Sequence, residues 1–242
     1  MSQFDNTPIM PSSSREPGSA GWLSVWIRAV TQPNEQTFID ITDHPDALPK
    51  TAYIWIFLVG TLSMIVSGVI QAALGAAGVG GQSGEGMGAV IGGSVIGAIC
   101  ISPVAGALSV LFFALGVAIM QWVAKLFGGT GSYDKLVYAM AAISVPVTLV
   151  SMLLVPFNAV PFLNICTGLL SIGLSFYALF LQVVAIKAVN RFGWGQAAGS
   201  VLLPGLTILI VCGCIVIGGL MLMGPMIGDV FSEINQSLQF AP

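Results

Sequence analysis

The sequence predicts an all-α membrane protein: a polytopic transmembrane helical bundle of five spans, preceded by a short interfacial amphipathic helix. Three observations support this prediction. Of the 242 residues, 56% are hydrophobic and only 7% are charged, whereas soluble domains carry about 25% charged residues. Five apolar runs are long enough to cross a bilayer core, which takes about 20 residues. All seven Lys and Arg residues lie in the N-terminal segment or at every second break between these runs.

The N-terminal part is expected to stay outside the membrane core. Residues 1–20 are polar and rich in Ser and Pro, without the apolar region of a secretory signal, so we expect a disordered tail. Residues 21–50 are expected to hold the interfacial helix and a linker. The helix has an apolar stripe with two tryptophans, typical of a membrane interface, at Trp22, Val25, Trp26, Ala29 and Val30. It either docks a partner or only anchors the topology.

The linker carries carboxylates around a histidine, a combination of residue types that can bind a metal ion. Carboxylates at positions 40, 43 and 46 surround His44, the only histidine of the chain. Pro45 and Pro49 disfavour a regular ligand geometry, so a solvated linker is the simpler interpretation and no metal site is predicted. The four cysteines are expected to be buried, inert thiols inside apolar runs, at Cys100, Cys166, Cys212 and Cys214.

The five spans form a membrane domain over residues 51–225, followed by a short extracytoplasmic tail, 226–242. They are placed approximately at residues 53–74, 89–127, 136–155, 162–189 and 197–223. The second run exceeds the length of a bilayer core, but a break at Ser102-Pro103 would leave almost no loop. We therefore predict one long helix kinked near Pro103, and leave open whether Ala89–Ser102 belongs to this span. Further kinks are expected at Pro146 and Pro204.

The basic residues predict the topology. Cytoplasmic loops of membrane proteins carry an excess of Lys and Arg, so the N-terminus is placed in the cytoplasm and the C-terminus outside. The acids follow the same pattern less strictly, since Glu85, Asp229 and Glu233 are placed outside. Acidic residues contribute little to orientation, so the prediction depends on the cations.

Three stretches resemble the Yip1 family of five-span membrane proteins. They are Trp26–Leu48, the segment LFGGTGSY at 126–133 with its continuation to Pro146, and LQVVAIKAVNRFGWGQAAGSVLLP at 181–204. The most distinctive part is a loop of the type L-F-G-G-x-G-S-[FY] before a helix with an internal proline. Physically, the glycines of this loop permit a tight turn and Ser132 suits a helix N-cap. The likeness covers most of residues 21–225.

The resemblance implies a membrane-trafficking role for eukaryotic members, which bind Rab-type small GTPases and sibling family members at the endoplasmic reticulum and Golgi. Those members typically carry a longer cytosolic N-terminal region than the one preceding Tyr53 here. This difference disfavours GTPase binding. It favours a bacterial cytoplasmic membrane as the location, with the endoplasmic reticulum or Golgi membrane as the alternative.

The sequence contains no catalytic constellation. Residues 81–84, GQSG, match a tetrapeptide of rhomboid proteases, but His44 is placed across the membrane and no other histidine could serve as base. We therefore predict no enzymatic activity, no catalytic residues and no cofactor. Ionisable groups are missing near the middle of the spans, which disfavours transport. A small-solute or lipid transporter stays the alternative, because helices broken at Pro103 and Pro146 could line a cavity.

The leading hypothesis is a non-enzymatic protein that acts by protein or lipid contacts, as a membrane organiser or accessory subunit of a membrane complex. Its expected partners are membrane lipids and a protein, in a homo- or hetero-oligomer. The net charge of −3 and the lack of a basic run exclude nucleic acid. The predicted contact residues belong to the interfacial helix and two cytoplasmic turns: Trp22, Trp26, Gly128, Gly129, Gly131, Asp134, Lys135, Lys187 and Arg191.

Overall fold

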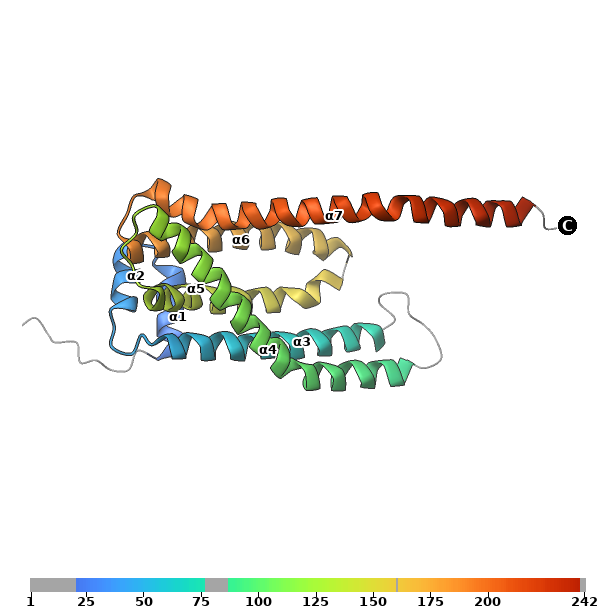
Figure 1. The fold of residues 1–242 in the computed structure, drawn as a ribbon. Helices are drawn as coiled ribbons and strands as arrows, with labels where there is room; N and C mark the ends of the chain where they lie inside the picture. Colours follow the sequence, from blue (N-terminus) through green and yellow to red (C-terminus); the bar gives the residue numbers. More distant parts are fainter. Residues whose placement is uncertain (1–20, 77–86, 160, 240–242) are drawn as a thin grey trace, which may run out of the picture.

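A computed structural model describes residues 21–76, 87–159 and 161–239. These residues form α-helices and one short 3-10 helix, and no strand is found among them (Figure 1). The predicted tail at 1–20 and the GQSG tetrapeptide at 81–84 lie outside the described residues. The elements are α1 Trp22–Thr31, α2 Glu35–Thr42, α3 Pro49–Ala76, α4 Met87–Leu126, α5 Tyr133–Leu154, η1 Val155–Ala159, α6 Pro161–Asn190 and α7 Trp194–Gln239.

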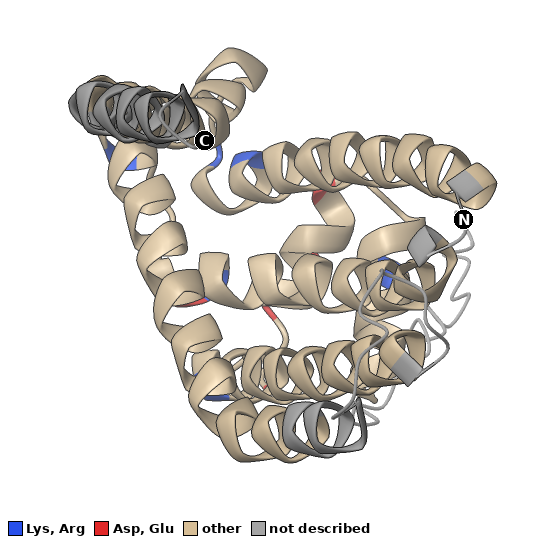
Figure 2. Ribbon diagram, turned by 90° about the vertical axis from the view of Figure 1, so that its right-hand side faces the viewer, with Lys and Arg blue, Asp and Glu red and all other residues tan. Residues whose placement is uncertain are grey.

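Five of these helices, α3 to α7, are long and apolar enough to cross a membrane. Each of the five predicted spans therefore corresponds to one helix, and the predicted fold class is confirmed. Helix α3 packs against α4 and α5, α6 packs against α5 and α7, and α4 also reaches α7. Figure 2 views the bundle along its long helices. In this view α4 runs obliquely from the side of α3 to the side of α7.

The long apolar run at 89–127 forms a single helix, as predicted. Figure 1 shows that α4 first runs alongside α3 and then bends to cross the bundle obliquely. Pro103 lies inside it and has no amide hydrogen to donate to the carbonyl of Ile99. The hydroxyl of Ser102, a buried residue, donates instead to Ile99 O at 2.9 Å. The bend therefore leaves no orphaned carbonyl at this position.

Helices α5 and α7 continue through their internal prolines. Pro146 lies within α5, and Pro204 lies within the part of α7 that could span the membrane. The kinks predicted at these two positions stay predictions. Helix α7 extends to Gln239. The segment after residue 225, for which a short tail was predicted, is therefore helical up to that residue.

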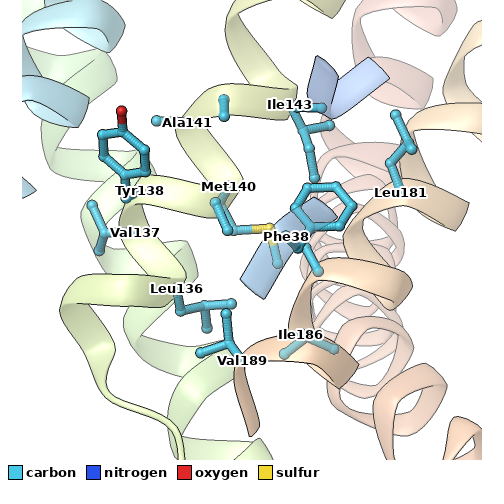
Figure 3. Packing of buried hydrophobic residues seen from close by; sticks show 14 of the residues in the cluster. Phe38, Leu136, Val137, Tyr138, Met140, Ala141, Ile143, Leu181, Ile186 and Val189 are labelled. Carbon is cyan, nitrogen blue, oxygen red and sulfur yellow. The ribbon is translucent and has the colours of Figure 1, made fainter. Parts of the chain in front are cut away.

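The apolar core lies at the end of the bundle where α1 and α2 pack. Every residue of α5 from Leu136 to Ile143 is buried, which makes α5 the central helix of this end. Helix α2 contributes Phe38, which is fully buried between α5 and α6 (Figure 3). Its ring lies beside Met140 and Ile143 and faces Leu181. Removing a buried Phe side chain costs about 3–5 kcal/mol, so α2 is firmly held.

Away from this end the helices expose apolar side chains. Phe162, Ile165 and Phe176 of α6 are 78, 68 and 70% exposed, as expected for helices whose solvent is lipid. The prediction of buried cysteines is wrong for the same reason: Cys100, Cys166, Cys212 and Cys214 are all exposed. An apolar run in a membrane helix does not show which positions face protein and which face lipid.

Candidate contact surface at the charged end

The charged side chains that the structure describes gather at the end of the bundle that carries α1, α2 and the turns after α4 and α6. We call this the charged end (Figures 1 and 2). Its basic residues come from five different helices and the turn after α6. Its acidic residues lie on α2, the linker after it and the first turn of α5. The charged residues are Arg28, Lys50, Lys125, Lys135, Lys187, Arg191, Glu35, Asp40, Asp43, Asp46 and Asp134.

The glycine turn between α4 and α5 depends on close backbone contacts. Gly128 has a φ of 88°, in the left-handed region that glycine adopts at little cost. A Cβ atom at Gly129 would lie 2.7 Å from the side-chain oxygen of Asn190, and one at Gly131 would lie 2.6 Å from the carbonyl of Val189. The turn therefore packs directly on the end of α6, and two of its glycines leave no room for a side chain.

Two amide side chains, Gln121 and Asn190, join the glycine turn to α4 and α6. Asn190, which is 1% exposed, accepts a hydrogen bond from Gly131 N at 3.2 Å. The Gln121 amide donates to Gly131 O at 2.7 Å and to Asn190 Oδ1 at 3.0 Å. Sequence analysis did not single out these two residues for the site. Their signal was a polar amide close to the end of an apolar span, five residues before it in α4 and at the last residue of α6.

The start of α5 is capped as predicted. The Ser132 hydroxyl accepts a hydrogen bond from Lys135 N at 3.4 Å, and Asp134 lies in the first turn, where the helix dipole favours a negative charge. Tyr133 is the first residue of α5. Its hydroxyl donates to Ala114 O at 3.0 Å and lies 3.2 Å from the Tyr53 hydroxyl. These bonds connect α5 to α3 and α4.

Two predicted contact residues, Lys187 and Lys135, hold the N-terminal helices in place. Lys187 forms an ion pair with Glu35 of α2, and its side chain is only 14% exposed. Its ammonium group also lies 4.2 Å from the ring centre of Trp194. Lys135 forms an ion pair with Asp43, just after α2. These partners could not be predicted from sequence patterns, because each pair joins segments far apart in the chain.

Helix α1 packs its predicted apolar stripe on the bundle. Val25 and Ala29 are buried, and Trp26 packs with Trp55 of α3 at 5.5 Å between ring centres. Trp22 also contacts Trp55 and is 48% exposed. The end of α1 is tied to α6, since the Tyr177 hydroxyl donates to the carbonyl of Val30. The tryptophans therefore serve mainly to dock this helix.

A smaller set of side chains remains exposed around these contacts. Trp122 and Leu126 at the end of α4 are 64 and 67% exposed, and Lys125 between them is exposed too. Across the glycine turn, Arg191 is exposed and has a φ of 55°, which is strained for a residue with a side chain. Within the described residues, neither cation has an ion-pair partner. We call Trp122, Lys125, Leu126, Arg191 and Trp194 the exposed rim.

A cavity of about 340 Å³ lies between α3, α4 and α5, away from the charged end. Apolar side chains make up part of its wall, and four hydroxyl groups from all three helices make up the rest. The hydroxyls belong to Ser63, Ser67, Ser109 and Thr148. Among the residues that the structure describes, no Asp, Glu, Lys, Arg or His lines it.

The fold and the exposed apolar surface define an all-α, multi-pass integral membrane protein. The family model of the Yip1 domain matches residues 27–216, which include α2 to α6 entirely, the second half of α1 and the first half of α7. The chain therefore belongs to the Yip1 domain family, as the resemblance of its three stretches indicated. No curated protein and no solved structure shows significant similarity to it.

Proposed function

We propose that the chain acts by contacts rather than by chemistry, as a membrane organiser or accessory subunit that binds anionic lipid and a protein partner at the exposed rim. The family to which it belongs is generally non-enzymatic. The proposed contact surface is smaller than the set of residues predicted from the sequence. Lys135 and Lys187 form ion pairs with Asp43 and Glu35 and are therefore left out of it. Lys125, Arg191 and Lys50 have no such partner among the described residues, and of these Lys125 and Arg191 lie on either side of the glycine turn with an exposed tryptophan nearby in the chain.

One observation carries this proposal: exposed aromatic and apolar side chains stand next to unpaired cations. Trp122 is 64% exposed and lies one helical turn before Lys125 on α4, and Trp194 is 50% exposed and begins α7 three residues after Arg191. Tryptophan favours the headgroup region of a bilayer, and each cation near an anionic surface contributes about 1 kcal/mol of binding. The strained backbone of Arg191 fits a residue that is kept for a contact, because glycine would avoid the strain.

The test replaces the two cations together, as Lys125→Glu with Arg191→Glu, in the full chain. We expect weaker co-purification of protein partners from native membranes in mild detergent, identified by mass spectrometry. We also expect fewer co-purified anionic lipids. The matched control is Lys50→Glu, which makes the same charge change at an exposed cation at the start of α3, outside the rim.

Unchanged recovery of partner and lipid in the double variant would contradict a contact at the rim. Substrate-dependent flux in liposomes that contain only this protein would instead support the alternative, a small-solute or lipid transporter. Flux must then be absent from liposomes without the protein. The first experiment measures association and the second measures transport, so the two hypotheses are tested separately.

A further inference from the structure

We propose that the cavity between α3, α4 and α5 binds an uncharged lipid through a polar end that bears hydroxyl or carbonyl groups, of which diacylglycerol is the simplest example. This inference does not depend on the exposed rim. It rests on the lining of the cavity, its closely packed wall, its position within the bundle and its size.

The hydroxyl groups of the lining suit a neutral hydrogen-bonding ligand. Ser109 and Thr148 donate to the carbonyls of Ala105 and Ser144 in their own helices, at 2.8 Å each. Their oxygens keep lone pairs that accept a hydrogen bond from a ligand hydroxyl. Ser63 and Ser67 lie one turn apart on α3, so both reach the same cavity and offer further hydroxyls.

One wall of the cavity is fixed by close contact between α3 and α4. A Cβ atom at Gly60 would lie 2.7 Å from Ser109 Oγ, and one at Gly106 would lie 2.2 Å from Thr61 Oγ1. Small residues at these positions let the two helices approach closely, as in other membrane helix pairs. The position of the Ser109 hydroxyl is thereby set by packing on both helices.

The cavity lies within the depth of the membrane rather than at its surface. Ser63 is about 21 Å along α3 from Pro49, and Thr148 is about 22 Å along α5 from Tyr133, at 1.5 Å per residue. Both values fall inside a hydrocarbon core of about 30 Å, and Ser67, about 27 Å along α3, lies near its far boundary. Ser63, Ser67 and Thr148 are half-buried. At this depth their exposed parts face lipid, so a ligand enters from the bilayer.

Charge and size exclude other occupants. A phosphate or ammonium group would have to leave water for a lining without a counter-charge, which costs several kcal/mol per ion. The volume of about 340 Å³ is too small for a transmembrane helix about 10 Å wide and 30 Å long. It is ample for a glycerol group with the first carbons of its chains. Ordered water is the remaining occupant, and the experiment distinguishes it from lipid.

The experiment uses the full chain in liposomes that contain diacylglycerol carrying a photoreactive diazirine and an alkyne. After irradiation, mass spectrometry locates the labelled peptides. We expect labels on the walls, at residues 56–67 and 145–148. Phosphatidic acid with the same two groups and the same acyl chains is the charged comparison. It is expected to label the lipid-facing surface without preference for these walls.

A variant that fills the cavity, Ser63→Leu with Ser67→Leu, is expected to lose labelling at the walls by about fivefold or more, since hydrogen bonds and space are both removed. The control Ser151→Leu replaces one exposed serine of α5 by leucine outside the cavity. It should leave the labelling of the walls unchanged. In the unmodified protein, an excess of diacylglycerol without the diazirine should suppress the wall labels selectively. This competition tests the site even if the filled variant does not fold.

Three outcomes would overturn the proposal. Equal labelling of the walls in the original and filled proteins would show that the cavity is not the site. Equal labelling by both lipids would identify ordinary surrounding lipid. An absence of wall labels with diacylglycerol, together with labels elsewhere on the protein, would leave water as the occupant.

Discussion

At the scale of single residues, the charged end depends on positions where only one kind of side chain fits. Asn190 bonds to a glycine backbone on one side and to Gln121 on the other, so neither amide is left unpaired in a buried place. A buried polar group without a partner costs about 1–3 kcal/mol. The glycine turn that these amides bind therefore stabilises the junction of α4, α5 and α6, in addition to any contact with a partner.

Gly131→Ala tests this interpretation. The added methyl group would lie 2.6 Å from Val189 O and 2.8 Å from Asn190 Oδ1, so the turn must move away from α6. Overpacking of this kind costs about 1–3 kcal/mol, and we expect a lower melting temperature in detergent. Gly116→Ala is the control, because a Cβ there meets nothing within 4 Å. Equal melting temperatures for the two variants would show that the turn tolerates a side chain.

At the scale of elements, the N-terminal helices are parts of the bundle rather than an appendage. Helix α2 inserts Phe38 into the core, α1 docks its tryptophan face, and two ion pairs connect the segment to α5 and α6. Because Lys187 is largely buried and Glu35 is about half exposed, breaking their pair should cost more than the ~1 kcal/mol of a surface pair but less than the ~3 kcal/mol of a buried one.

A charge-swap experiment tests the role of this pair in holding α2. Glu35→Lys alone places two cations together and should speed amide hydrogen exchange in α2, which mass spectrometry measures. Adding Lys187→Glu should restore part of the protection. Restoration is incomplete because the swap puts a negative charge at the end of α6 and loses the contact with Trp194. Gln36→Lys, which adds one positive charge next to Glu35 and keeps the pair with Lys187, should leave exchange nearly unchanged.

Equally rapid exchange in the single and double variants would mean that position 35 matters for another reason. The helix dipole is the first candidate, since Glu35 lies in the first turn of α2.

Comparison of sequence and structure also belongs at this scale. The spans could be predicted because each is longer and more apolar than a helix of a soluble protein needs to be. Helix α4 could be predicted as one helix because a break at Pro103 would have left almost no loop. The Ser132 cap could be predicted because it depends on neighbours in the chain. The partners of Lys135 and Lys187 could not, because those pairs bring together distant segments. The exposure of the cysteines was missed because apolar residues face lipid and protein alike.

At the scale of the whole molecule, the protein is asymmetric along the membrane normal. Its described charges and its compact core lie at one end, whereas the rest consists of apolar helices with wide lipid-facing surfaces. Cations cross a bilayer core at a high cost, so all the turns that carry them must lie on one side. With five spans, we therefore expect the segment before α3 and the end of α7 to lie in opposite compartments.

Reporter fusions test this arrangement in living cells. Green fluorescent protein folds in the cytoplasm and alkaline phosphatase is active only outside it, so each reports one side. We expect fluorescence from an N-terminal fusion and phosphatase activity from a fusion after Gln239. A fusion at Gly193, in the exposed turn between α6 and α7, should fluoresce, because Lys187 and Arg191 lie just before it. Fluorescence from both termini would require an even number of spans, and one of α3 to α7 would then have to remain outside the membrane core.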